Sequence, residues 1–181
     1  MNTRLRRLAF LLLTFLSKFG DTVFIVGLPI YFYESGGRHV LDSTYVGLII
    51  TITILLAHRV VIDVSSRNPL LVCGLGEIGM GTLELILLVL TYVIGVQSWL
   101  ILLFVFPLAF IYNLYAPAKF FRLQEYFFSE DVFYYTTLQS ALWHAGLLLG
   151  VALSGFIVAS YGLRGILIVD AVSFLAFGVP V

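Results

Sequence analysis

Long apolar segments separated by short polar connections are the feature that most constrains how this 181-residue chain folds. A helix that crosses a bilayer needs about 20 mostly apolar residues. By that criterion we predict five complete spans and the start of a sixth, at residues 8–33, 43–62, 70–95, 98–117, 136–160 and from 165 to the end. Because hydrocarbon offers the backbone no hydrogen-bond partners, such spans are expected to be helical. The sequence therefore predicts an all-α, polytopic membrane bundle that forms a single domain over residues 1–181.

Composition supports a membrane protein and excludes several other classes. Charged residues make up 11% of the chain and apolar residues 61%, whereas soluble domains carry about 25% charged residues. The net charge is zero, which gives no case for a nucleic-acid partner. Cys73 is the single cysteine, so neither a disulfide nor a cysteine metal site is expected, and the three histidines lack ligand spacing. We predict no cofactor, no metal and no enzymatic activity.

The distribution of basic residues predicts which side of the membrane each loop faces. With the N-terminus inside, the outer loops hold only Arg38 and Arg164. The inner loops hold Arg4, Arg6, Arg7, Arg59, Arg67, Lys119 and Arg122. We therefore predict a cytoplasmic N-terminus and a location in the inner (plasma) membrane. The start of the chain resembles a secretory signal, but no small-residue cleavage site follows, so we interpret it as the first span.

Six ionisable side chains are predicted to lie inside the spans: Lys18, Asp21, Glu77, Glu84, His144 and Asp170. Asp or Lys at the centre of a span costs roughly 2.5–3.5 kcal/mol on an insertion scale, so each is expected to face a partner or a water-filled cavity. Lys18 and Asp21 are three residues apart and can pair on one helix face, although Lys18 can also extend toward the inner headgroups.

For the Lys18–Asp21 pair, a purely structural ion pair and a role at a cavity or in coupling carry equal weight, and Glu77 is weighed in the same way. Glu84 and Asp170 receive a smaller functional weight because both are expected nearer a membrane interface. His144, one turn after Ser140, is expected to be a packed or hydrogen-bonded side chain rather than a proton relay.

Small residues predict close helix contacts. The stretch "CGLGEIGMG" contains a literal G-x-G-x-x-G, but it lacks the preceding strand and the later acidic residue of a dinucleotide site. We interpret it as one packing face, made of Gly74, Glu77, Gly81 and Glu84. The predicted fifth span carries two further faces, and we expect each to contact a neighbouring helix. The first holds Gly146, Gly150 and Ser154, and the second holds Ala152, Gly155, Ala159 and Gly162.

The segment "APAKFFRLQEYFFSEDVFYY" alternates charged and aromatic residues. This pattern suits either an amphipathic helix in the cytoplasmic interface or a solvated, anchored loop, and we favour the loop.

Several stretches together resemble the N-terminal six-helix half of the major facilitator superfamily, and its drug, macrolide and enterobactin exporter branch in particular. They include "LSKFGDTVFIVGLPIYFY" in the first span, "AP" before the interfacial loop and "DAVSFL" in the sixth span. In "RVVIDVSSRN", Asp63 and Arg67 match the loop signature between helices two and three. In the exporter signature of helix five, Gly146, Gly150 and Gly155 match, whereas Val151 replaces its proline.

The resemblance implies a secondary transporter that moves a drug-like or siderophore-like small molecule outward by alternating access, coupled to proton entry. Lys18, Asp21 and Glu77 are the candidate transport and coupling residues, and Asp63 and Arg67 the candidate cytoplasmic latch. The sixth apolar segment is short and has no basic anchor after it, so we expect a missing C-terminal half or a second chain as partner. The alternatives are a membrane scaffold or assembly protein and an inactive transporter remnant.

Overall fold

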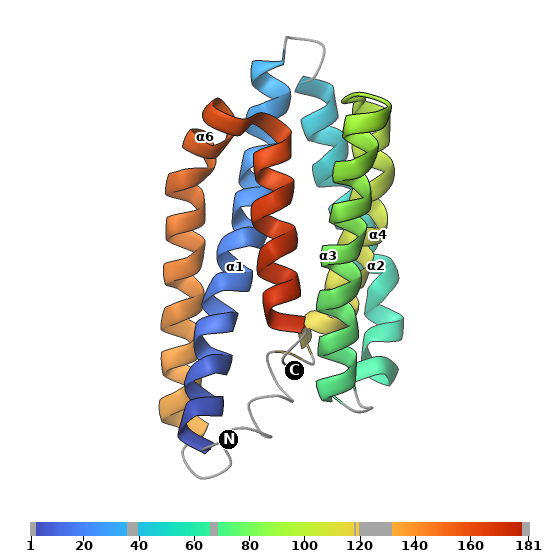
Figure 1. The fold of residues 1–181 in the computed structure, drawn as a ribbon. Helices are drawn as coiled ribbons and strands as arrows, with labels where there is room; N and C mark the ends of the chain where they lie inside the picture. Colours follow the sequence, from blue (N-terminus) through green and yellow to red (C-terminus); the bar gives the residue numbers. More distant parts are fainter. Residues whose placement is uncertain (1–2, 36–39, 66–68, 118, 120–131, 179–181) are drawn as a thin grey trace.

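The computed structural model describes residues 3–35, 40–65, 69–117, 119 and 132–178. These residues form five helices and no strand, in agreement with the predicted all-α class. The helices are α1 (Thr3–Glu34), α2 (Val40–Ser65), α3 (Pro69–Val93), α4 (Ser98–Pro117) and α6 (Val132–Gly178). Figure 1 shows them as one elongated bundle.

Helix α6 reverses direction at Gly162. This residue has φ 60° and ψ −154°, a backbone conformation that is essentially restricted to glycine. The two arms on either side of Gly162 run in opposite directions (Figure 1). They correspond to the separately predicted helices at 136–160 and from 165 onward.

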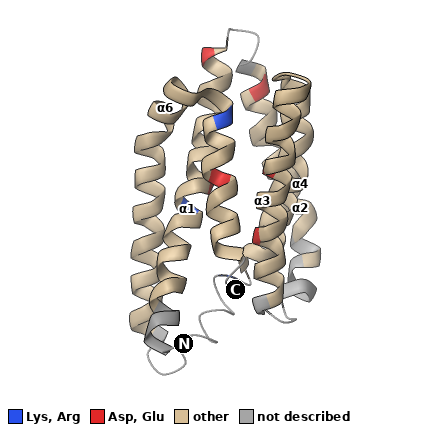
Figure 2. Ribbon diagram, viewed as in Figure 1, with Lys and Arg blue, Asp and Glu red and all other residues tan. Residues whose placement is uncertain are grey.

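Four helices are long and apolar enough to cross a membrane, namely the segments Leu8–Glu34, Leu71–Val93, Ser98–Pro117 and Phe133–Gly178. The described apolar part of α2, Leu41–Ala57, is shorter. Many large apolar side chains face outward from the bundle, and few charged residues lie along the helices (Figure 2). The chain is therefore suited to a membrane environment, while the number of segments that span the bilayer stays a prediction.

The helices contact one another in a closed ring. Helix α1 contacts α2 and α6, α2 contacts α4, α4 contacts α3, and α3 contacts α6. The largest buried cluster includes Leu28 of α1, Leu87 of α3, Ile101 of α4 and Phe174 of α6. Such a ring places side chains from every helix at its centre.

Glycines of the first predicted face of α6 pack against α1, as expected. A Cβ atom added at Gly146 would lie 2.7 Å from the carbonyl oxygen of Phe15, and one at Gly150 would lie 2.9 Å from that of Phe19. The second arm of α6 packs on α1 as well, because a Cβ at Gly27 would lie 3.0 Å from Ile166. Helix α1 therefore lies between the two arms.

The second predicted face of α6 has no neighbour in the described part of the chain. Gly155 has open space beside it, and Ala152 and Ala159 are exposed. The expected contact is not formed among the described residues, because the first face and the turn at Gly162 already direct both arms toward α1, and a contact with another helix stays a prediction. Gly155 consequently contributes nothing to packing inside this bundle.

The predicted α3 face is confirmed at Gly81. A Cβ atom there would lie 3.0 Å from the carbonyl oxygen of Ala171 on α6. Gly76, outside the predicted face, also lies against a neighbour, since its Cβ would lie 2.5 Å from the Tyr115 ring. Gly76 and Gly81 of "CGLGEIGMG" therefore allow neighbouring segments to pack closely against the middle of α3.

Some predictions fall on parts of the chain outside the description. Arg67 lies outside the described residues, as do residues 120–131 of the predicted interfacial loop. Asp63 belongs to the backbone of α2, but its side chain is likewise outside the description.

Candidate functional site

The predicted ion pair between Lys18 and Asp21 is present on α1. The Lys18 ammonium donates to Oδ2 of Asp21 at 2.5 Å. It also lies 4.7 Å from the ring centroid of Trp143 on α6, a cation–π arrangement. Both side chains are largely buried. The pair therefore satisfies both charges inside the bundle, and Lys18 does not extend outward.

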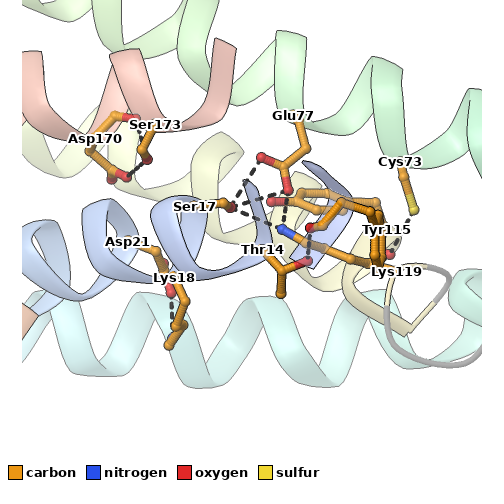
Figure 3. Close-up of polar contacts among 11 residues, drawn as sticks. Thr14, Ser17, Lys18, Asp21, Cys73, Glu77, Tyr115, Lys119, Asp170 and Ser173 are labelled. Carbon is orange, nitrogen blue, oxygen red and sulfur yellow. Dashed lines mark hydrogen bonds and ion pairs between the residues drawn. The ribbon is translucent and has the colours of Figure 1, made fainter. Parts of the chain in front are cut away.

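A second buried ion pair connects three elements. The Lys119 ammonium donates to Oε1 of Glu77 at 2.5 Å and to Oγ of Ser17 at 2.9 Å. The Ser17 hydroxyl in turn lies 3.2 Å from Oε2 of Glu77, within hydrogen-bond distance. Ser17 is on α1, Glu77 is on α3, and Lys119 follows α4 (Figure 3). Since Glu77 is fully buried, Lys119 supplies the positive charge that this carboxylate needs.

Lys119 is the functional residue that sequence reasoning missed. The sequence predicts a cytoplasmic loop here, because Lys119 follows the apolar span that ends at Pro117 and belongs to a segment that alternates charged and aromatic residues. In the structure its side chain turns back into the bundle, is 6% exposed, and lies 4.0 Å from the ring centroid of Phe177. One sequence signal could have suggested this lysine–glutamate pair. It is a lone lysine directly after one apolar span, combined with a glutamate on another span that has no basic residue nearby in the sequence.

Glu84 and Asp170 form a third polar centre, between α3 and the second arm of α6. The two carboxyl groups interact electrostatically. Both residues are at most 1% exposed, and their expected position near a membrane interface stays a prediction. Both oxygens of Glu84 and Oδ2 of Asp170 have no hydrogen-bond partner among the described residues. Ser173 contacts Asp170 through its hydroxyl, which lies 2.8 Å from the main-chain oxygen and 3.4 Å from Oδ1.

A partly open cavity of about 140 Å³, here called the central cavity, lies between the helices. All five helices line it, and Asp21, Asn113 and Asp170 are among the polar side chains at its wall. Its other lining side chains are mostly apolar, and they include Phe24, Ile50, Ile54, Met80, Val105 and Leu108. A cavity of about 150 Å³ with apolar walls is large enough to bind benzene. The space therefore suits a small apolar group with a polar substituent.

A smaller space separates the two ion pairs. Its volume is about 10 Å³, and it is lined by Lys18, Asp21, Tyr112, Tyr115 and Lys119, among others. This is close to the minimum that holds one water molecule. Asp21 and Tyr112 line both this space and the central cavity. Of the predicted coupling residues, Asp21 therefore reaches the cavity, whereas Glu77 does not line it.

His144 lies away from this centre. It is exposed on α6, and its Nδ1 lies 2.7 Å from the carbonyl oxygen of Ser140. The predicted hydrogen-bonded role is thereby confirmed. Within the described part of the chain, no group of three His, Cys, Asp or Glu residues is placed to hold a metal ion.

Comparisons with known proteins identify no relative of this chain. No protein-family model matches the chain, no curated protein is detectably similar to it in sequence, and no solved structure is detectably similar to it in fold. The resemblance to the major facilitator superfamily therefore stays a prediction from the sequence motifs.

Proposed function

We propose that this chain forms part of a secondary transporter that moves a drug-like or siderophore-like small molecule across the membrane by alternating access, coupled to protons. The observation that carries the proposal is the central cavity, which all five helices line and whose wall holds Asp21 and Asp170. Ionisable side chains within apolar helices are costly, and they mark substrate or ion pathways in membrane proteins.

The size of the cavity bears on what the chain could hold in this conformation. About 140 Å³ accommodates a group of roughly one aromatic ring, which is smaller than a typical drug. A larger substrate would need the helices around the cavity to separate. Alternating access, in which one bundle rocks against another around a midplane site, supplies such an opening.

The two lysine–carboxylate pairs would respond differently to that movement. Lys18 and Asp21 belong to one helix, so their pair survives a rigid-body displacement of α1. The Lys119–Glu77–Ser17 contacts join α3, α1 and the residue after α4, and they must break if these elements separate. We therefore propose that the Lys119–Glu77 pair stabilises the conformation described here.

Transport by the purified protein, reconstituted in liposomes, tests the proposal. The probe is an aromatic fluorescent dye together with an imposed pH gradient, and Asp21→Asn is compared with Glu34→Gln, a change at an exposed position of α1. We expect gradient-dependent dye movement that Asp21→Asn reduces at least tenfold and Glu34→Gln leaves unchanged. Dye movement that persists in Asp21→Asn would remove this residue from coupling, and no movement of drug-like or siderophore probes would count against transport.

A membrane scaffold is the second candidate, and one observation favours it. The exposed face formed by Ala152, Gly155 and Ala159 has open space beside its glycine, and small residues allow close approach of another helix in a membrane. Chemical crosslinking of the chain with a single cysteine at Gly155, in a Cys73→Ser background, tests this function. A specific crosslinked partner combined with no transport would favour the scaffold.

A further inference from the structure

We propose that Glu84 and Asp170 together form a proton-binding site between α3 and the second arm of α6. The two residues share at least one proton when the bundle is in the conformation described here. Neither residue is among the coupling candidates that the sequence suggests, and the site consists of two carboxyl groups that bind the proton between them.

The first argument is geometric. Glu84 and Asp170 are both buried on helices that meet where Gly81 packs against Ala171, and both oxygens of Glu84 and Oδ2 of Asp170 have no hydrogen-bond partner among the described residues. Two ionised carboxylates cannot hydrogen-bond to each other because each group is then only an acceptor. One proton on either group supplies the missing donor and converts an unsatisfied contact into a charge-assisted hydrogen bond.

The second argument is the distribution of charge. Four carboxyl groups are buried in the described interior, at Asp21, Glu77, Glu84 and Asp170. Lys18 neutralises the first and Lys119 the second, each at 2.5 Å. No described cation neutralises the remaining two, and an isolated buried charge costs several kcal/mol. Protonation is the direct way for the remaining pair to avoid that cost.

The surroundings of Glu84 and Asp170 also favour a shared proton. The polar groups that interact electrostatically with the pair are Asp21 from α1, Glu77 from α3, Tyr112 and Tyr115 from α4, and Ser173 from α6. Lys18 is already held by Asp21. Arg164, on the same arm as Asp170, lies instead 3.9 Å from the ring of Tyr92. Each buried lysine is thus already paired with another carboxylate, so neither is left to compensate the charge of Glu84 and Asp170.

Close packing keeps the two residues together. A Cβ atom at Gly81, one turn before Glu84, would lie 3.0 Å from the backbone oxygen of Ala171, next to Asp170. On the other side, a Cβ atom at Gly20 of α1 would lie 2.9 Å from Oδ1 of Asp170. The pair is therefore enclosed by two helices that approach at glycines, and Asp170 also borders the central cavity. The protonation state of this pair could therefore depend on whether the cavity is occupied. This role rests on the transport proposal.

Infrared spectroscopy of the purified chain in detergent tests the proton site directly and requires no transport. At about pH 8, exposed carboxyl groups are ionised because their ordinary pKa values lie near 4. We expect the unmodified chain to retain a carbonyl-stretch band of protonated carboxyl groups at that pH. Glu84→Gln and Asp170→Asn should each shift the band, the double variant should lose it completely, and the exposed control Glu34→Gln should keep it.

Isotope labelling provides a measurement that needs no substitution, in case the double variant does not fold. Aspartate or glutamate labelled with carbon-13 at the side-chain carboxyl should shift the same band in the unmodified chain. A spectrum without a protonated-carboxyl band, or a band unaffected by both labels and by both substitutions, would overturn the proposal. Loss of the band on addition of sodium ions would overturn it as well, because the pair would then bind a metal cation in place of a proton. Absence of transport with the band intact would reject the transport proposal and leave the proton site standing.

Discussion

Nζ of Lys119 lies 2.5 Å from Oε1 of Glu77, although 42 positions separate the two residues along the chain. Both are buried, and the contact joins α3 to the residue that follows α4. Removal of one partner from a buried pair leaves an uncompensated charge, which typically destabilises a protein by about 3–5 kcal/mol.

We expect Lys119→Met to destabilise the folded chain by about 3–5 kcal/mol, because it leaves the Glu77 carboxylate buried without a counter-charge. The double variant Lys119→Met/Glu77→Gln should recover more than half of that loss, since it removes both charges. Denaturant unfolding in detergent measures both free energies. Equal stability of the single variant and the unmodified chain would show that the pair contributes nothing.

Two glycines of α6 offer a matched comparison of close packing with open space. Gly150→Ala places a Cβ atom 2.7 Å from Cβ of Thr22 and 2.9 Å from the oxygen of Phe19, and such overpacking typically costs about 1–3 kcal/mol. Gly155→Ala meets no atom within 4 Å and should be neutral or stabilising by up to about 1 kcal/mol. Thermal unfolding of the two variants checks the difference. Equal effects at both positions would contradict the contact between α1 and the first arm of α6.

The reversal of α6 depends on the backbone conformation of one residue. Gly162→Ala forces a side chain into a conformation with φ 60°, which costs about 1–3 kcal/mol. Gly47→Ala is the control, because that glycine has open space beside it and no positive φ. The measured quantity is again the free energy of unfolding. Equal stability of the two variants would show that a side chain added at Gly162 does not strain the turn.

Ala109 lines the central cavity, so a larger side chain there should fill part of it. We expect Ala109→Leu to stabilise the chain by about 0.5–2 kcal/mol, as cavity filling commonly does. If the cavity binds the transported molecule, the same change should abolish dye movement in the liposome assay. Increased stability with unchanged transport would place the substrate path elsewhere.

Local features of this chain could be predicted from the sequence, because they depend on nearby residues. The predicted range 98–117 coincides with α4, and the three-residue spacing of Lys18 and Asp21 predicts their pair. The small residues at Gly146 and Gly150 likewise predict a close helix contact, and the structure identifies α1 as the partner.

Long-range relationships could not be predicted in the same way. The Lys119–Glu77 pair depends on how the chain turns after Pro117, a position that the sequence presents as the start of a loop. The contact between Glu84 and Asp170 depends on the reversal at Gly162, which brings the second arm of α6 against α3. The open space beside Gly155 depends on which face of α6 the bundle already occupies. Each of these follows from the arrangement of whole helices, and spacing along one helix carries no information about it.

The reversal at Gly162 also has a consequence for biogenesis. Residues 163–178 contact both α1 and α3, yet the ribosome synthesises them after both. Until that arm emerges, the nascent bundle has nothing to place against Gly20, Gly81 and Glu84, and an unpaired acidic side chain remains accessible to water or to the insertion machinery. The bundle is therefore completed only when residues 163–178 insert between α1 and α3. Translation that pauses before residue 163 should leave an open intermediate that is sensitive to proteolysis.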